Sequence, residues 1–390
     1  MFQDRYGNEL STRSAAARDA YAAGVDSLMA ATPGMDAHFQ AAVTADEGFA
    51  LGHIALARAK QLLGRGHEAK APLARARELA AGTTPREQSQ IAIFDGILTG
   101  QGAAALEAIR EHLKSWPRDA MALAPATSVF GLIGFSGLAG REVDQLALLT
   151  PLETQYGDDW WYRTQLAFAQ IELQMFDEGS RNIEAALAAC PRSAHSAHIR
   201  GHLFYELGER EAGLSFLTEW MKTYPRDGLM HCHNSWHLAL WSIETGRTKD
   251  AWRIYEDALR PGAAWGPQIN VATDCAAYLV RAEMAGEPRR RDLWQEIAAY
   301  TTKWFPKPGL GFVDMHAALA YAMAGDGDAL AKFVESPRGP TADMLAPMGR
   351  GFDAYASGAW ARAVAEIEPL LATHERLGGS RAQRDLLEYL

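Results

Sequence analysis

The sequence predicts an all-α protein, an α-α superhelix of tandem helix-turn-helix repeats. Segments with apolar residues at helical spacing follow one another, and the breaks between them are short, rich in Gly, Pro or Asp, and without strand-like runs. Two helices joined by a turn and repeated along the chain are the building block of a helical solenoid. The clearest predicted helices are Ala50–Leu63, His67–Ala80, Arg86–Leu98, Asp159–Gln174, Ser193–Leu207, Glu209–Thr223 and Leu229–Glu244.

The length of the repeat identifies its type. The segment Pro191–Ala194 (PRSA) returns 34 residues later as Pro225–Gly228 (PRDG), and Gly179 and Gly213 are separated by the same 34 residues. A period of about 34 residues, closed by a proline and with small residues where the two helices touch, is typical of tetratricopeptide repeats. We expect aromatic-proline pairs to end one repeat and pack against the next, at Trp116-Pro117, Tyr224-Pro225 and Phe305-Pro306.

The repeats are predicted to form one irregular solenoid over residues 1–390. We expect N-terminal repeats in 1–156, central repeats in 157–335, and a C-terminal repeat with a closing helix in 336–390. The repeat pattern is interrupted, which predicts insertions at 125–140, 261–269 and 305–312.

Composition excludes several classes of function. The net charge of −10 disfavours nucleic acid and anionic membranes as partners, because both are bound by basic surfaces. No stretch of 18 uninterrupted apolar residues predicts a membrane span, and the first ten residues lack the pattern of a secretory signal. The odd count of three cysteines, without metal-type spacing, indicates a reducing cytoplasm.

Polar residues recur at equivalent positions of successive central repeats. His198 and His202 are four residues apart, so both lie on one helix face, and His233 and His237 repeat that arrangement 35 residues later. Because first helices line the concave wall of such a superhelix, we expect these side chains to share one inner strip. The predicted catalytic strip consists of His198, His202, His233, His237, Asp274, Asp314 and His316.

Two chemistries fit this strip. The four histidines supply ligands that zinc, manganese or iron accept, and a bound divalent metal makes hydroxide or polarises a carbonyl. Without a metal, a histidine beside Asp274 or Asp314 serves as a general acid-base pair. The structural alternatives are a hydrogen-bonded polar lining or a groove for a peptide. The predicted supporting residues are Glu206, Asn234, Trp236, Asn270, Arg384 and Asp385.

Two cysteines lie beside these residues. Cys232 stands between two histidines and Cys275 follows Asp274, so either is a candidate nucleophile. Cysteine is also among the most buried residue types, and core packing is the favoured interpretation.

Several motifs resemble those of the tetratricopeptide-repeat protein 38 family. The His198–Gly208 segment looks like the family's histidine-bearing helix, and His233-Asn234-Ser235-Trp236-His237 looks like its His-Asn-x-Trp-His helix. Asp314-Met315-His316 resembles its Asp-Ala-His element, and Gly378–Asp385 (GGSRAQRD) resembles its closing motif. The motifs cover about half of the chain, residues 195–385. The resemblance implies a tetratricopeptide-like solenoid with a shared His/Asp/Arg constellation, and it implies no particular reaction.

We therefore expect a cytoplasmic protein that binds a small molecule in a His/Asp-lined concave pocket, with a hydrolysis or elimination as the plainest chemistry. The alternative is a non-catalytic scaffold that binds a peptide or protein along the concave face, the commonest use of such repeats. The sequence leaves open whether the chain forms a homo-oligomer.

Overall fold

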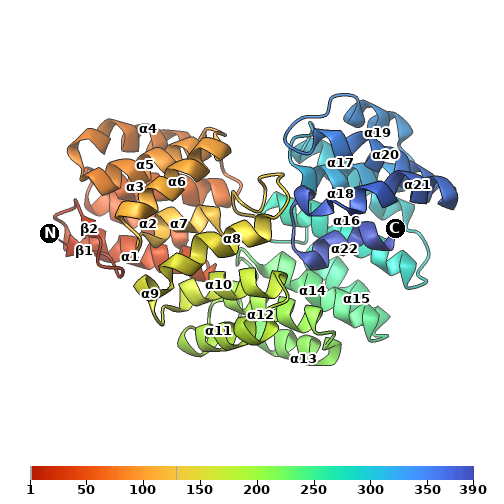
Figure 1. The fold of residues 1–390 in the computed structure, drawn as a ribbon, viewed down its shortest axis with the longest axis horizontal. Helices are drawn as coiled ribbons and strands as arrows, with labels where there is room; N and C mark the ends of the chain where they lie inside the picture. Colours follow the sequence, from red (N-terminus) through yellow and green to blue (C-terminus); the bar gives the residue numbers. More distant parts are fainter. Residues whose placement is uncertain (1, 129) are drawn as a thin grey trace. The chain divides into compact units, whose positions relative to one another are not determined.

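A computed structural model describes residues 2–128 and 130–390, and it shows an all-α protein whose helices pack in consecutive pairs (Figure 1). Two antiparallel strands of two residues each, β1 (Phe2–Gln3) and β2 (Glu9–Leu10), precede the helices. The helices are α1 Ala15–Ala30, α2 Met35–Ala45, α3 Ala50–Leu62, α4 Lys70–Leu79, α5 Pro85–Leu98, α6 Gly102–Ser115, α7 Ala120–Leu123, α8 Arg141–Leu149, α9 Glu153–Tyr156, α10 Trp160–Glu172, α11 Phe176–Ala189, α12 Ala194–Glu206, α13 Arg210–Met221, α14 His231–Glu244, α15 Thr248–Ile254, α16 Gln268–Met284, α17 Arg291–Trp304, α18 Gly311–Ala324, α19 Gly327–Val334, α20 Ala342–Ala356, α21 Trp360–Leu371 and α22 Arg381–Tyr389.

The chain divides into two compact units. The first unit comprises residues 1–133 and 143–200, and the second comprises 134–142 and 201–390. Of the three dividing points, 142/143 and 200/201 fall inside helices, α8 and α12, and 133/134 falls in the connection before α8. Each unit is a set of paired helices, such as α1 with α2 and α10 with α11 in the first, and α14 with α15 and α20 with α21 in the second. A single continuous solenoid over the whole chain stays a prediction.

The observed helices agree with the predicted ones to within a few residues, because local signals set their ends. Thr84 and Glu87 form a capping box at the start of α5, and the Asp159 carboxylate accepts the Tyr162 N–H at the start of α10. Trp116 and Phe305, each followed by proline, are the C-cap residues of α6 and α17. The predicted insertions 261–269 and 305–312 span the irregular connections before α16 and α18, and 125–140 precedes α8 and includes Val129, which lies outside the described residues.

The glycines that mark the 34-residue period are sites of close helix packing. A β-carbon added at Gly179 would lie 2.6 Å from Ile171 of the partner helix α10, and one added at Gly213 would lie 2.7 Å from the Trp241 ring on α14. Real β-carbons do not approach that closely, so only glycine allows the helices to pack at these points.

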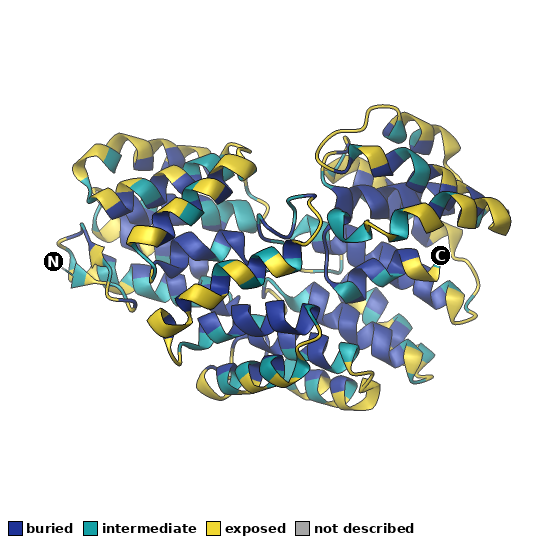
Figure 2. Ribbon diagram, in the orientation of Figure 1, coloured by how far each residue is buried: buried dark blue, intermediate teal, exposed yellow. Residues whose placement is uncertain are grey.

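The helices differ in how far they are buried (Figure 2). Every residue of α18 is buried, and α14 and α16 are buried over almost their whole lengths. The second helices α13, α15, α17 and α21 are buried on one face only and exposed on the other. The first helices therefore form the interior of the second unit, where polar side chains are shielded from water. None of the helices formed by the described residues combines the length and the apolar character that a membrane crossing requires.

The closing helix α22 returns to the first helices of the second unit. The Tyr205 hydroxyl donates to Asp385 at 2.7 Å, and Arg381 forms an ion pair with Glu206 at 3.0 Å, so both contacts join α22 to the end of α12. Ser380 and Gln383 form a capping box that starts α22 after the Gly378-Gly379 reversal. The C-terminal motif is therefore fixed by side chains almost two hundred residues earlier in the sequence.

Candidate metal centre

Four buried histidines from two helices form one compact group. His198 and His202 come from α12, and His233 and His237 come from α14; within each helix the pair is separated by one turn. One ring nitrogen of each lies within 4.8 Å of the others. His198 is counted with the first unit only because the dividing point lies inside α12, between Arg200 and Gly201. The i,i+4 pairs of the sequence thus become a single cluster of four imidazoles.

The spacing of these nitrogens approaches what a metal ion requires. With metal–nitrogen bonds of about 2.0–2.1 Å, a tetrahedral site places its ligand nitrogens about 3.3 Å apart, and opposite ligands of a planar site lie about 4.1 Å apart. The observed limit of 4.8 Å exceeds these values by on the order of 1 Å. Binding of an ion would therefore require the four rings to move closer together.

Burial keeps two of the four imidazoles neutral. Burial, and to a smaller extent the neighbouring His233, lowers the pKa of His202 to about 3. Burial also holds the pKa of His237 well below its usual value, with His202, His233 and Arg281 as smaller causes. Because a histidine must be neutral to bind a metal, protons do not compete with a cation for these two ligands at neutral pH.

A carboxylate orients one of the four rings. The Nδ1 atom of His233 lies 2.9 and 3.0 Å from the two oxygens of Asp274 on α16, and both residues are buried. Burial raises the pKa of Asp274, while His233 and the side chain of Asn270 oppose that rise. A hydrogen bond from Nδ1–H to a carboxylate leaves Nε2 of His233 as the ligand atom, the arrangement found behind many metal-bound histidines.

Aromatic rings surround the cluster and exclude water from it. The Trp236 ring stacks on His233 with a centroid distance of 5.3 Å and meets His237 edge-on at 4.9 Å. The His202 and His237 rings lie 4.9 Å apart, and Trp241 lies 5.8 Å from His237 on the other side. In such apolar surroundings, electrostatic interactions with a bound cation are stronger than in water.

The last part of the predicted strip lies outside this group of four. The Asp314 carboxylate accepts the Gly309 N–H at 2.9 Å, and burial raises its pKa to about 7. His316 donates from Nδ1 to the carbonyl of Phe312 at 2.7 Å, and its buried Nε2 has no hydrogen-bond partner among the described residues. Among the described residues no hydrogen bond joins Asp314 to His316, because residues two apart on a helix face different sides.

The predicted supporting residues differ in what they contact. Trp236 contacts two members of the cluster, and Asn270 contacts Asp274, the carboxylate behind His233. Glu206, Arg384 and Asp385 hold the closing helix instead, and Arg384 does so by donating to Glu142 at 2.9 Å and to the carbonyl of Gly379. These contacts attach α22 to the neighbouring helices. Asn234 is fully buried, and both polar atoms of its side chain lack a partner in the described part of the chain.

The cysteines do not have the environment of a nucleophile. Burial raises the pKa of both Cys232 and Cys275 well above the usual value for a thiol, and the Cys275 thiol donates to the carbonyl of Leu259 at 3.0 Å. A thiol in such apolar surroundings remains protonated at neutral pH. Both cysteine side chains pack in the protein core.

The sequence interpretation missed Arg281. This residue lies two turns beyond Asp274 on the same face of α16, and it is buried, with 8% of its surface exposed. Its guanidinium lies 5.7 Å from the centroid of Trp236 and donates to the carbonyl of Ala382 on α22 at 2.9 Å. The heptad spacing from Asp274 was the available signal, because it places both side chains on one face.

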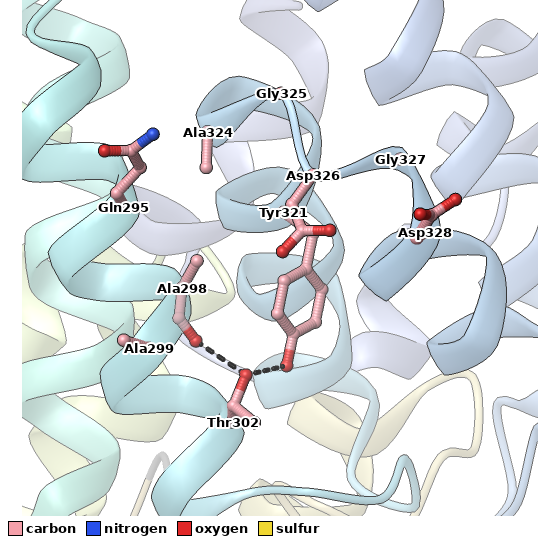
Figure 3. A pocket seen from close by; sticks show the side chains of 10 residues that line it. All are labelled: Gln295, Ala298, Ala299, Thr302, Tyr321, Ala324, Gly325, Asp326, Gly327 and Asp328. Atoms are coloured by element: carbon pink, nitrogen blue, oxygen red, sulfur yellow. Dashed lines mark hydrogen bonds between the residues drawn. The ribbon is translucent and has the colours of Figure 1, made fainter.

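A separate hollow of about 570 Å³ lies in the second unit, between α17 and the region where α18 passes into α19 (Figure 3). Small side chains of α17 and the turn between α18 and α19 line it, and a hydrogen bond of 3.0 Å joins Thr302 to Tyr321 at its base. Its polar rim is formed by Asp326, which caps α19, and Asp328. This hollow contains none of the buried histidines.

No protein-family model matches the chain. Its fold is similar to that of the human IFIT1 dimer with PPP-AAAA, at 11% identity and a TM-score of 0.46, over 100% of this chain and 87% of that one. It is also similar to the P58(IPK) TPR domain, at 14% identity and a TM-score of 0.24, over 96% of each chain. A third similar structure is Naa15/Naa10 bound to HypK-THB, at 12% identity and a TM-score of 0.25, over 95% of this chain and 60% of that one. At these identities the similarity concerns the helical fold alone.

Proposed function

We propose that this protein binds a divalent transition metal through His198, His202, His233 and His237, in the interior of its tetratricopeptide-like repeats. The observation that carries the proposal is the convergence of four buried ring nitrogens within 4.8 Å. Four imidazole nitrogens that converge on one point are a donor set that a divalent transition metal accepts.

The ligand set narrows the choice of metal. Imidazole nitrogen suits zinc, iron and copper, whereas manganese prefers oxygen ligands. The group found in the described residues contains four nitrogen donors and no directly coordinating carboxylate, because Asp274 is directed at His233. We therefore favour zinc or iron over manganese.

The coordination number decides between a structural and a catalytic role. An ion that all four histidines held with no open position would have a structural role, whereas an ion with open positions would admit substrate or water. Such an ion would supply a Lewis acid or a hydroxide for hydrolysis or elimination of a small molecule. The protein contributes Asp274, which holds the His233 ring in place, and the tryptophans that exclude water.

The resemblance to the tetratricopeptide-repeat protein 38 family is part of the proposal. Its His-Asn-x-Trp-His motif is the segment 233–237, which supplies two of the four proposed ligands and the tryptophan stacked on one of them. We propose that the family shares this metal centre. A cytoplasmic location stays a prediction.

Elemental analysis of untagged protein tests the proposal. We expect about one equivalent of zinc or iron per chain, lost when His202 and His237 are both replaced by alanine. His231→Ala is the matched control, because His231 lies on the same helix but outside the group of four. Metal-free wild-type protein that takes up no zinc or iron on reconstitution would contradict the assignment, and so would full metal content in the double variant.

A peptide-binding scaffold receives less support. That function requires first helices that are open to a peptide, with rows of Lys or Arg. In the second unit α18 is buried at every residue, and α14 and α16 nearly so. A stable protein partner bound along α14, α16 or α18 would reverse this ranking.

A further inference from the structure

Arg281 carries a buried positive charge that forms no direct ion pair with the described residues. Its side chain is 92% buried, and its hydrogen bonds go to two carbonyl oxygens, of Ala277 at 3.3 Å and Ala382 at 2.9 Å. Among the described residues, no carboxylate lies within ion-pair distance of it. Asp385 is not in contact with Arg281 but is near enough for the two charges to interact, and it also accepts the Tyr205 hydroxyl. A buried guanidinium without an ion-pair partner in direct contact is costly, so an anion that contacts it would stabilise it.

Two further polar groups beside Arg281 lack partners. The Trp236 ring lies 5.7 Å from the guanidinium, and its indole N–H is fully buried without an acceptor among the described residues. His316, on the neighbouring helix α18, is 2% exposed, and its Nε2 is likewise without a partner there. Arg281 and His316 lie on α16 and α18, two helices that pack against each other. Burial lowers the pKa of His316 to about 4, and the charge of Arg281 is a smaller cause of that shift.

The protonation of His316 defines what it can bind. Its Nδ1 atom donates to the Phe312 carbonyl, so in the neutral ring Nε2 is a lone pair that accepts a hydrogen bond. Arg281 and the Trp236 indole are donors. Together the three groups therefore provide a positively charged donor (Arg281), a neutral donor (the Trp236 indole N–H) and an acceptor (Nε2 of His316).

We propose that these groups form a binding site for a small hydroxycarboxylate. The carboxylate of the ligand accepts hydrogen bonds from Arg281 and from the Trp236 indole N–H, and its hydroxyl donates to Nε2 of His316. An ammonium group in place of the hydroxyl is disfavoured, because it would lie beside the guanidinium. The site uses none of the four clustered histidines, so it goes beyond the metal proposal and does not depend on it.

Calorimetric titration of the full-length protein with two probes tests the site. Lactate carries a carboxylate and a hydroxyl, whereas propionate is matched in size but lacks the hydroxyl. We expect lactate to bind at least tenfold more tightly than propionate. A wild-type protein that binds neither probe at millimolar concentration would overturn the proposal, as would equal affinities.

Three variants separate the roles of the two side chains. Arg281→Met should abolish binding of both probes, and Arg281→Lys, which keeps the charge but not the fork of donors, should weaken lactate binding at least tenfold. His316→Phe should reduce lactate affinity to that of propionate, because only the contact to the hydroxyl is lost. Undiminished lactate binding in Arg281→Lys, or a preserved preference for lactate in His316→Phe, would contradict the assignment. The zinc or iron content of these variants should stay that of the wild type, which separates a failure of this site from a failure of the metal centre.

Discussion

Replacement of Asp274 by asparagine separates metal binding from folding. The amide oxygen of asparagine still accepts a hydrogen bond from Nδ1 of His233, so the ring orientation is kept while the negative charge is removed. Loss of a carboxylate behind a metal-bound histidine typically lowers metal affinity 10–100-fold. Since a tenfold change corresponds to about 1.4 kcal/mol, we expect a loss of about 1.4–2.7 kcal/mol in binding free energy. Competition of the metal-free protein with a chromophoric zinc chelator measures this loss.

The same substitution should leave the metal-free protein as stable as before. Burial raises the pKa of Asp274, which shows that its ionised form is unfavourable in the folded protein. A neutral asparagine removes that penalty and keeps one hydrogen bond, so the free energy of unfolding should fall by no more than about 1 kcal/mol. If zinc affinity is unchanged in Asp274→Asn, then His233 is not a metal ligand and the proposed centre is wrong.

Three further outcomes follow from buried groups outside the metal ligands. The pKa of Asp314 is raised from 3.8 to about 7 in the folded protein, so the free energy of unfolding falls as pH rises from 4 to 7 and the carboxyl ionises. In Asp314→Asn this fall should be smaller by on the order of 4 kcal/mol. Urea unfolding at pH 4 and pH 8 measures the difference. Gly213→Ala should lower the free energy of unfolding by about 1–3 kcal/mol, because the new methyl group would lie 2.7 Å from Trp241; an unchanged urea midpoint would refute this. Cys232 and Cys275, which burial keeps protonated, should react with a thiol reagent only after denaturation, and modification of the native protein would contradict their core positions.

The repeat period predicted the four-histidine cluster because it preserves both position and phase. His198 and His233 are 35 residues apart, almost one repeat, so they occupy equivalent turns of successive first helices. The structure does not include Asp314 and His316 in that group of four. Two insertions precede α18 and lengthen the spacing, and a separation of two residues places these side chains on different sides of the helix.

Other parts of the structure depend on contacts that a periodic pattern does not contain. Arginine is mostly exposed in proteins, so Arg281 gave no signal of its own beyond its heptad spacing from Asp274. The path of α22 depends on partners far away in sequence, such as Tyr205 for Asp385 and Glu142 for Arg384. A capping sequence predicts where a helix starts, but it does not predict which earlier helix the new helix packs against.

The burial of the first helices explains why their polar side chains point to a function. In the second unit α14, α16 and α18 are interior elements, where apolar residues would give the greater stability. The chain instead places histidines, Asp274 and Arg281 there, and leaves Nε2 of His316 and the Trp236 indole N–H without partners among the described residues. Such unsatisfied groups destabilise a core unless ligands complete them. A cation between α12 and α14 would satisfy one set of groups, and an anion beside α16 and α18 would satisfy the other. The Asp274 variant should therefore weaken only metal binding, and the Arg281 variants should weaken only binding of the carboxylate.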